Sequence, residues 1–128
     1  MQEKHLYEYA VVRYVPRVER EEFVNVGLIM MCKRRRWLRV VLAPEWNRID
    51  AIAAGPVDRD DVSRQLSAFE IIGNARDRLN PIATLEAEER FRWLTAVRSA
   101  CIQTSRPHPG ICGDLDATFD RILAELVL

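Results

Sequence analysis

The stretch that decides the fold is EEFVNVGLIMMCKRRRWLRVVL, residues 21–42. Its centre, residues 23–32, is apolar at almost every position, which is typical of a strand inside a sheet that is covered on both faces. Residues 37–43 resume the apolar character after four consecutive bases, and such a short link indicates an antiparallel hairpin. Strict alternation predicts one face of the first strand with Val24, Val26, Leu28, Met30 and Cys32, and the other with Phe23, Asn25, Gly27, Ile29 and Met31.

The segment before this hairpin predicts a further strand. HLYEYAVVRYV, residues 5–15, is rich in Tyr and Val, and Pro16 stops the pairing. We therefore expect a three-stranded antiparallel meander of residues 5–15, 23–32 and 37–43. If paired residue numbers sum to about 38, Arg13 lies opposite Asn25 and Val11 lies opposite Gly27.

From residue 44 onward the pattern becomes helical. Residues 44–56 predict a helical turn or a short irregular segment. Asp58 is placed to cap a helix near residues 59–75, and Thr84 is expected to start a second helix that runs to about Ser99. Asp114 is placed to cap the last helix. CIQTSRPHPGIC, residues 101–112, holds two prolines and a glycine, so its first half (101–106) is a candidate fourth strand and the rest a loop. The sequence predicts one α+β domain, residues 1–128, with the N-terminal meander packed against about three C-terminal helices.

Composition narrows the class of protein. The 19 Lys and Arg balance 19 Asp and Glu, so no global charge draws the chain to nucleic acid or to anionic membrane. The three cysteines form no CxxC pair, and the N-terminus has no basic segment followed by an apolar core. We expect a cytoplasmic protein with reduced thiols and no membrane contact.

One polar corner interrupts the apolar strands. Arg13, Glu22 and Asn25 are expected to meet at one end of the sheet beside Gly27, where the missing side chain allows a ligand or another backbone to approach. A structural interpretation stands beside the functional one. A buried amide left unpaired costs about 1–3 kcal/mol, so Arg13 and Glu22 could serve only to satisfy Asn25, and a strand glycine often marks a bulge.

The basic turn is a second candidate surface, made of Lys33, Arg34, Arg35, Arg36, Trp37 and Arg39. Bases beside an indole predict contact with nucleic acid, through phosphates and stacking. A solvated hairpin turn is the favoured interpretation, because only one aromatic is interleaved with the bases. Contact with a protein is the third use, since Arg and Trp are enriched among binding hot spots.

No catalytic motif is present. Ser105 and His108 place a hydroxyl and an imidazole in one loop, but neither a base held against the serine nor an oxyanion site can be recognised. Neither histidine has cysteines or carboxylates at ligand spacing, so we expect no metal and no cofactor.

The stretch YAVVRYVPRVEREEFVNVGLIMMC, residues 9–32, resembles the signature of a bacterial family known as domain of unknown function 3037. That signature, Y-x-x-x-R-Y-x-P followed by E-F-x-N-x-G, is matched by Tyr9, Arg13, Tyr14, Pro16, Glu22, Phe23, Asn25 and Gly27. Glu21 departs from the pattern, because a small residue or glycine usually precedes the E-F pair.

The resemblance implies an accessory protein, since members are often encoded beside a HipA-like kinase of the class associated with toxin–antitoxin modules. Our leading hypothesis is a regulatory protein that binds such a partner through the Arg13, Glu22, Asn25 and Gly27 corner and the basic turn. A small enzyme or nucleotide-binding protein using the same corner is the rival hypothesis, and nucleic-acid binding through residues 33–39 is the third. The sequence leaves homo-oligomerisation open.

Overall fold

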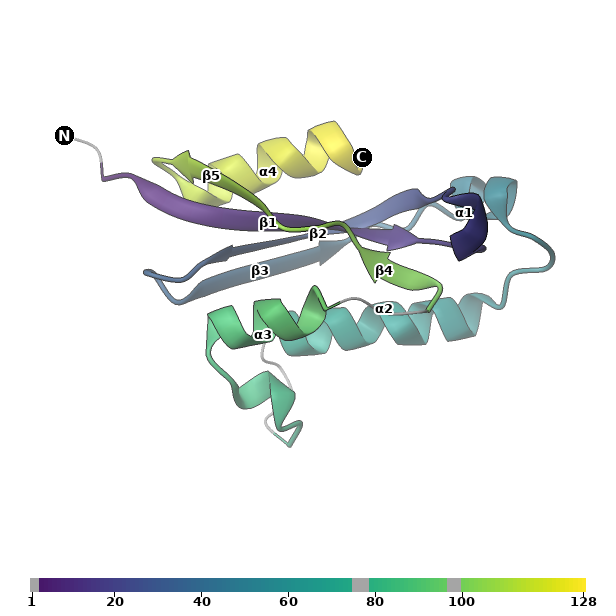
Figure 1. Cartoon of the computed structure of the whole chain (residues 1–128), viewed down its shortest axis with the longest axis horizontal. Coiled ribbons are helices and arrows are strands. Elements are labelled where there is room, and N and C mark those ends of the chain that lie inside the picture. Colours follow the sequence, from purple (N-terminus) through teal and green to yellow (C-terminus); the bar gives the residue numbers. More distant parts are fainter. Residues whose placement is uncertain (1–2, 75–78, 97–99) are drawn as a thin grey trace.

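The structure, a computed structural model, describes residues 3–74, 79–96 and 100–128. An antiparallel sheet of five strands forms its middle layer, with α4 on one face and α2 and α3 on the other (Figure 1). In chain order the elements are β1 (His5–Tyr14), the 3-10 turn η1 (Val18–Arg20), β2 (Val24–Cys32), β3 (Trp37–Leu42), α1 (Trp46–Ile52), α2 (Arg59–Gly73), the 3-10 turn η2 (Ile82–Thr84), α3 (Ala87–Leu94), β4 (Ile102–Thr104), β5 (His108–Cys112) and α4 (Leu115–Leu126).

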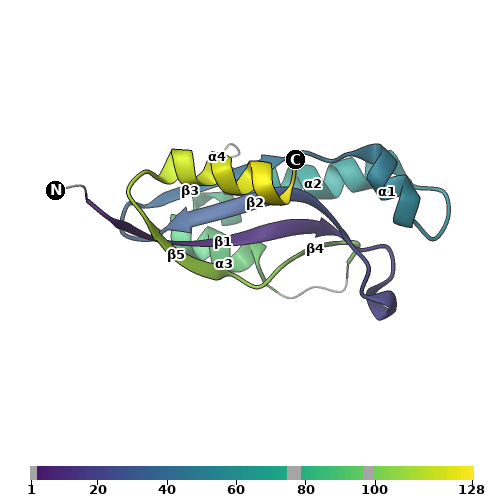
Figure 2. The same cartoon turned by 90° about the horizontal axis from the view of Figure 1, so that it is seen from above.

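The strand order confirms the predicted meander. The order is β3-β2-β1-β4, and β5 also pairs with β1, beyond β4. Figure 2 shows β3 along one margin of the sheet and β4 and β5 along the opposite margin. The predicted fourth strand is therefore present, and the α+β class is confirmed.

The predicted loop after residue 106 is wrong, because His108–Cys112 forms strand β5. β4 covers only the last three residues of β1, so the edge of β1 from His5 to Tyr9 would otherwise lack a neighbour; β5 pairs along that length. Pro109 is tolerated there because an edge strand can turn its missing N–H toward solvent.

A register shift in β2 changes which side chains share a face. Arg13 lies opposite Asn25 as predicted, but Gly27 lies opposite Val12 and not Val11, so Val26 is an extra residue in β2. Such a bulge reverses the alternation locally. The predicted faces are therefore wrong at the start of β2: its two valines join Ile29 and Met31, and Asn25 joins Leu28 and Met30.

Two apolar cores lie on the two faces of the sheet. One core lies between the sheet and helices α2 and α3 and includes Val12, Ile29, Phe69 and Phe91. The other lies between the sheet and α4 and consists of Tyr7, Val11, Leu28, Met30, Phe119, Ile122 and Val127. β2 contributes to both, which confirms its central position. None of the helices in the described ranges has the length and apolar character that spanning a bilayer requires.

The helix caps show where local sequence was informative. The side chains of Asp58 and Asp114 accept hydrogen bonds from Asp61 N–H and Ala117 N–H, so both predicted caps are confirmed. The predicted start at Thr84 is wrong: this residue ends η2, where its hydroxyl bonds the Pro81 carbonyl, and α3 begins three residues later. Residues 97–99 of the predicted helix lie outside the described residues.

Candidate functional site

Arg13 lies between two amides in the middle of the sheet. It is directly opposite Asn25 of β2 and directly opposite Gln103 of β4. Like Val11, two residues earlier in β1, it is on the face that α4 covers. That helix ends at Leu126, so the row of Gln103, Arg13 and Asn25 lies where helical cover of this face stops.

The guanidinium of Arg13 lies over an aromatic ring and has no ionic partner. Its central carbon is 3.9 Å from the ring centroid of Phe23, which is 45% exposed. Its Nε–H is buried without a hydrogen-bond acceptor, and no carboxylate of the described residues forms an ion pair with it. Burial lowers the pKa of this guanidinium below its usual value, but an arginine remains charged at neutral pH.

Asn25 connects the same row to the end of α4. Its Nδ2 donates to the carbonyl of Leu126 at 2.9 Å, which satisfies one of the last carbonyls of that helix. Its Oδ1 is buried without a donor. Within the described residues, this oxygen and Arg13 Nε are the buried side-chain polar atoms that lack a partner, and they belong to residues directly opposite each other.

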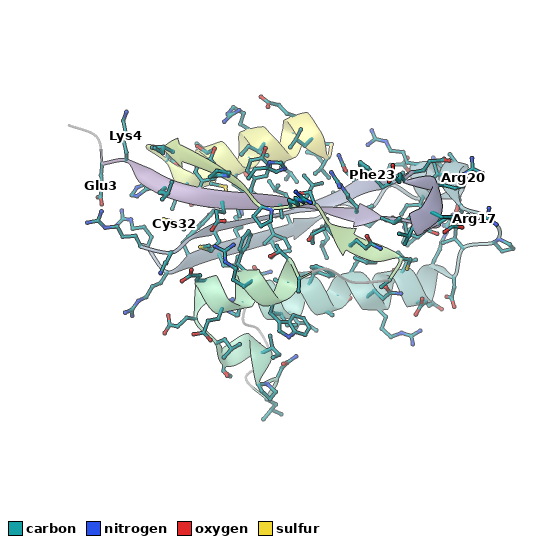
Figure 3. The ribbon with its side chains drawn as sticks, viewed as in Figure 1. Glu3, Lys4, Arg17, Arg20, Phe23 and Cys32 are labelled. Atoms are coloured by element: carbon teal, nitrogen blue, oxygen red, sulfur yellow. The ribbon has the colours of Figure 1, made fainter. Side chains whose placement is uncertain are left out.

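The structure separates Glu22 from this pair. The carboxylate of Glu22 bonds Arg20 at 2.6 Å and forms no ion pair with Arg13. With Arg17 and Arg20 it lines a hollow of about 340 Å³ between η1 and residues 51–54. Figure 3 shows both arginines at this end of the molecule. The expected meeting of all three corner side chains therefore does not form.

Gly27 is also placed for packing. A Cβ at this position would lie 2.7 Å from Cδ2 of Leu42 and 2.9 Å from the carbonyl oxygen of Val41. The glycine therefore lets β3 approach β2 closely, next to the bulge, and opens no space for a ligand. Phe23 takes its place in the candidate site, which consists of Arg13, Phe23 and Asn25. Its position in the E-F-x-N signature was the signal that could have identified it.

The basic turn lies at the opposite end of β2. Lys33 is eight positions after Asn25, roughly 26 Å along an extended strand, so the two candidate surfaces are not contiguous. Its ion pairs join Lys33 to Glu88 at 3.2 Å, Arg35 to Glu3 at 3.8 Å, and Arg39 to Asp116 at 3.2 Å and Asp120 at 3.1 Å.

Three of the five bases in the turn are therefore in ion pairs among the described residues, and the indole packs against another ring. Trp37 is half-buried, with its ring edge-on to Phe119. Of the bases in this turn, Arg34 and Arg36 have no acidic partner in the part of the chain that the structure describes. This arrangement leaves less free positive charge for phosphates than the sequence of the turn implies.

Ser105 and His108 do not form a nucleophile and its base. Ser105 is buried, its hydroxyl accepting from Val11 N–H at 2.9 Å and donating to the Arg106 carbonyl at 3.1 Å. His108 is exposed, with its ring 5.2 Å from that of Tyr9. Both residues lie at the edge of the sheet, beside β1. Across residues 3–74, 79–96 and 100–128, no group of three His, Cys, Asp or Glu is placed to hold a metal ion.

The fold and the site together define a helix-flanked antiparallel α+β protein with an unpaired arginine on an exposed aromatic ring. The chain belongs to the family described as Protein of unknown function (DUF3037), whose sequence model matches residues 9–127. No curated protein and no solved structure matches the chain.

Proposed function

We propose that this protein is an accessory protein that binds a protein partner through Arg13, Phe23 and Asn25. The observation that carries the proposal is the state of Arg13: a half-buried guanidinium with no carboxylate beside it and a buried, unbonded Nε–H. A partly desolvated charge without a partner is unfavourable in the free protein. A carboxylate or carbonyl supplied by a partner would relieve that penalty.

The surroundings of Arg13 are those of a binding hot spot. Phe23 exposes nearly half of its surface, and Leu126, whose carbonyl is held by Asn25, is also exposed. Arginine and aromatic side chains with apolar neighbours dominate the energetics of many protein interfaces. The partner would place an acidic group on the guanidinium and an apolar side chain on the ring, and a donor could reach Asn25 Oδ1.

The partner that the family resemblance favours is a HipA-like kinase, which would make this protein a regulatory component of a toxin–antitoxin type module. Enzymatic use of the corner has less support, because general acid–base work needs a carboxylate within reach and Glu22 is held by Arg20. Nucleic-acid binding by the turn has less support because most of its bases are already in ion pairs.

Co-purification with a HipA-like kinase tests the proposal. We expect a stable complex at micromolar concentration, weakened about tenfold or more by Arg13→Gln and by Phe23→Ala, as for hot-spot residues. Arg64→Gln is the matched control, because Arg64 is exposed on α2 and has no contact with this site. A wild-type protein that never co-elutes, or equal binding by Arg13→Gln and Arg64→Gln, would reject the proposal.

A further inference from the structure

The sheet divides into two arms at its end nearest the N-terminus. The β1–β2 ladder ends at the pair of Glu8 and Met31. Beyond it, β1 continues paired with β5 as far as His5, whereas β2 continues paired with β3 as far as Cys32. Figure 1 shows the result, with β1 and β5 above and the β2–β3 hairpin below. Backbone groups on the inner sides of the two arms have no ladder partner.

A hollow of about 510 Å³ lies where the arms separate. It is lined by Lys4, His5, Leu6, Cys32, Lys33 and Arg34. Figure 3 places Lys4 and Cys32 at this end of the sheet, one on each arm. Ligand sites for small molecules typically occupy about 300–1,000 Å³, so the hollow is large enough for one.

An exposed apolar patch begins at Leu6, which lines this hollow, and continues to Ile111, which lies beside Leu6 outside the lining. Leu6 is 67% exposed, and Ile111, directly opposite it in the β1–β5 ladder, is 65% exposed. These two neighbouring aliphatic side chains form a patch that is largely open to solvent. Covering this patch with an apolar ligand would be favourable, because it removes apolar surface from water. Cys32, behind the hollow, is fully buried.

The rim of the hollow is positively charged. Lys4 and Arg34 have no acidic partner among the described residues, whereas the ammonium group of Lys33 is 3.2 Å from Glu88. An exposed apolar patch beside two unpaired cations matches a ligand with an apolar chain and an anionic head group.

We propose that the hollow between the two arms binds a medium-chain carboxylate. The aliphatic chain lies on Leu6 and Ile111, and the carboxylate meets Arg34 and Lys4. The hollow and Arg13 lie at opposite ends of β2. Binding in the hollow is therefore independent of the proposed partner surface.

Titration of ¹⁵N-labelled protein with sodium octanoate at low salt, followed by amide shifts, tests this proposal. We expect saturable shifts confined to residues 4–6, 32–34 and 110–112. Acetate lacks the chain and 1-octanol lacks the charge, so each should bind several-fold more weakly. Raising the salt concentration should weaken octanoate as well, because the cations are exposed.

Two substitutions separate the head group from the chain. Arg34→Gln should weaken octanoate by up to about fivefold, as expected for an exposed ion pair, and Leu6→Ser by about tenfold through lost apolar contact. Arg64→Gln and Val18→Ser are matched controls at exposed positions away from the hollow, and neither should change binding. Shifts that do not saturate, equal binding of octanol, or unchanged affinity in both test variants would overturn the proposal.

Discussion

Ser105 is joined to Val11 through both its main chain and its side chain. Its N–H donates to the Val11 carbonyl at 2.9 Å, and its hydroxyl accepts from the Val11 N–H at 2.9 Å. This happens between β4 and β5, where the outer ladder along β1 is interrupted. The hydroxyl therefore takes the place of the carbonyl that a neighbouring strand would otherwise offer to the Val11 N–H.

We predict that Ser105→Ala destabilises the protein by about 1–3 kcal/mol, because the buried Val11 N–H loses its acceptor. Urea unfolding of the variant measures the change. Ser67→Ala, at an exposed position on α2, is the control and should alter stability little. A Ser105→Ala protein as stable as the wild type would show that water or another acceptor serves this N–H.

Gly27 should be intolerant of any side chain. Gly27→Ala forces a methyl group to within 3 Å of Leu42 and of the Val41 carbonyl, so β3 must shift; overpacking of this kind costs roughly 1–3 kcal/mol. Gly55→Ala is a close control, since a Cβ there meets nothing within 4 Å. Thermal unfolding of the two variants should differ clearly, and equal melting temperatures would contradict the packing role.

Glu21 holds a backbone conformation that suits glycine. Its φ of 54° and ψ of 26° are left-handed, at the end of η1, a conformation in which glycine has no Cβ to clash. A side chain there costs about 1–2 kcal/mol, against roughly 0.5–1 kcal/mol of extra chain entropy for glycine.

Glu21→Gly is therefore predicted to raise the free energy of unfolding by about 0.5–1 kcal/mol. The matched variant Glu21→Ala removes the same carboxylate but keeps a Cβ, so it should bring no such gain. Chemical denaturation of all three proteins compares them directly. If alanine stabilises as much as glycine, the effect comes from charge and not from backbone strain.

Arg13 and Arg90 are both half-buried arginines, but only Arg90 is satisfied. Its guanidinium donates to the carbonyls of Leu85, Ile72 and Gly73. Arg13→Met should leave the protein as stable as wild type or more stable by up to about 1 kcal/mol, because an unbonded polar group is removed. Arg90→Met should destabilise it by about 1–3 kcal/mol.

Urea unfolding of the two methionine variants measures this contrast, and the partner-binding assay should show the reverse order. Arg13→Met is expected to lose the partner while remaining folded, whereas Arg90→Met should bind in proportion to its folded fraction. A large loss of stability in Arg13→Met would mean that this arginine is a structural residue.

Local sequence was sufficient for much of this fold. The bounds of β1, β2 and β3 and the caps at Asp58 and Asp114 follow from apolar period and from side chains that bond their own helix ends. These features depend on residues only a few positions apart, so they can be recognised without knowing the rest of the chain. The pairing of Arg13 with Asn25 also followed, because a short loop restricts the register.

Other features depended on contacts between distant segments. Residues 108–112 carry a proline and a glycine, which predict a loop; they form β5 because β1 is long enough to leave an unpaired edge. The bulge at Val26 places Asn25 against the end of α4, although nothing in the local pattern marks it. Likewise, the sequence predicts that Glu22 meets Arg13, but the path of the η1 loop places its carboxylate against Arg20.

The amino-acid sequence by itself determined the central, doubly covered strand and the family of this protein, because apolar period and a short signature are local properties. The tertiary structure alone decided which polar atoms stay unsatisfied and where the sheet divides into two arms. Both depend on the sum of many long-range packing and hydrogen-bonding choices, and a single residue's shift in register is enough to change them.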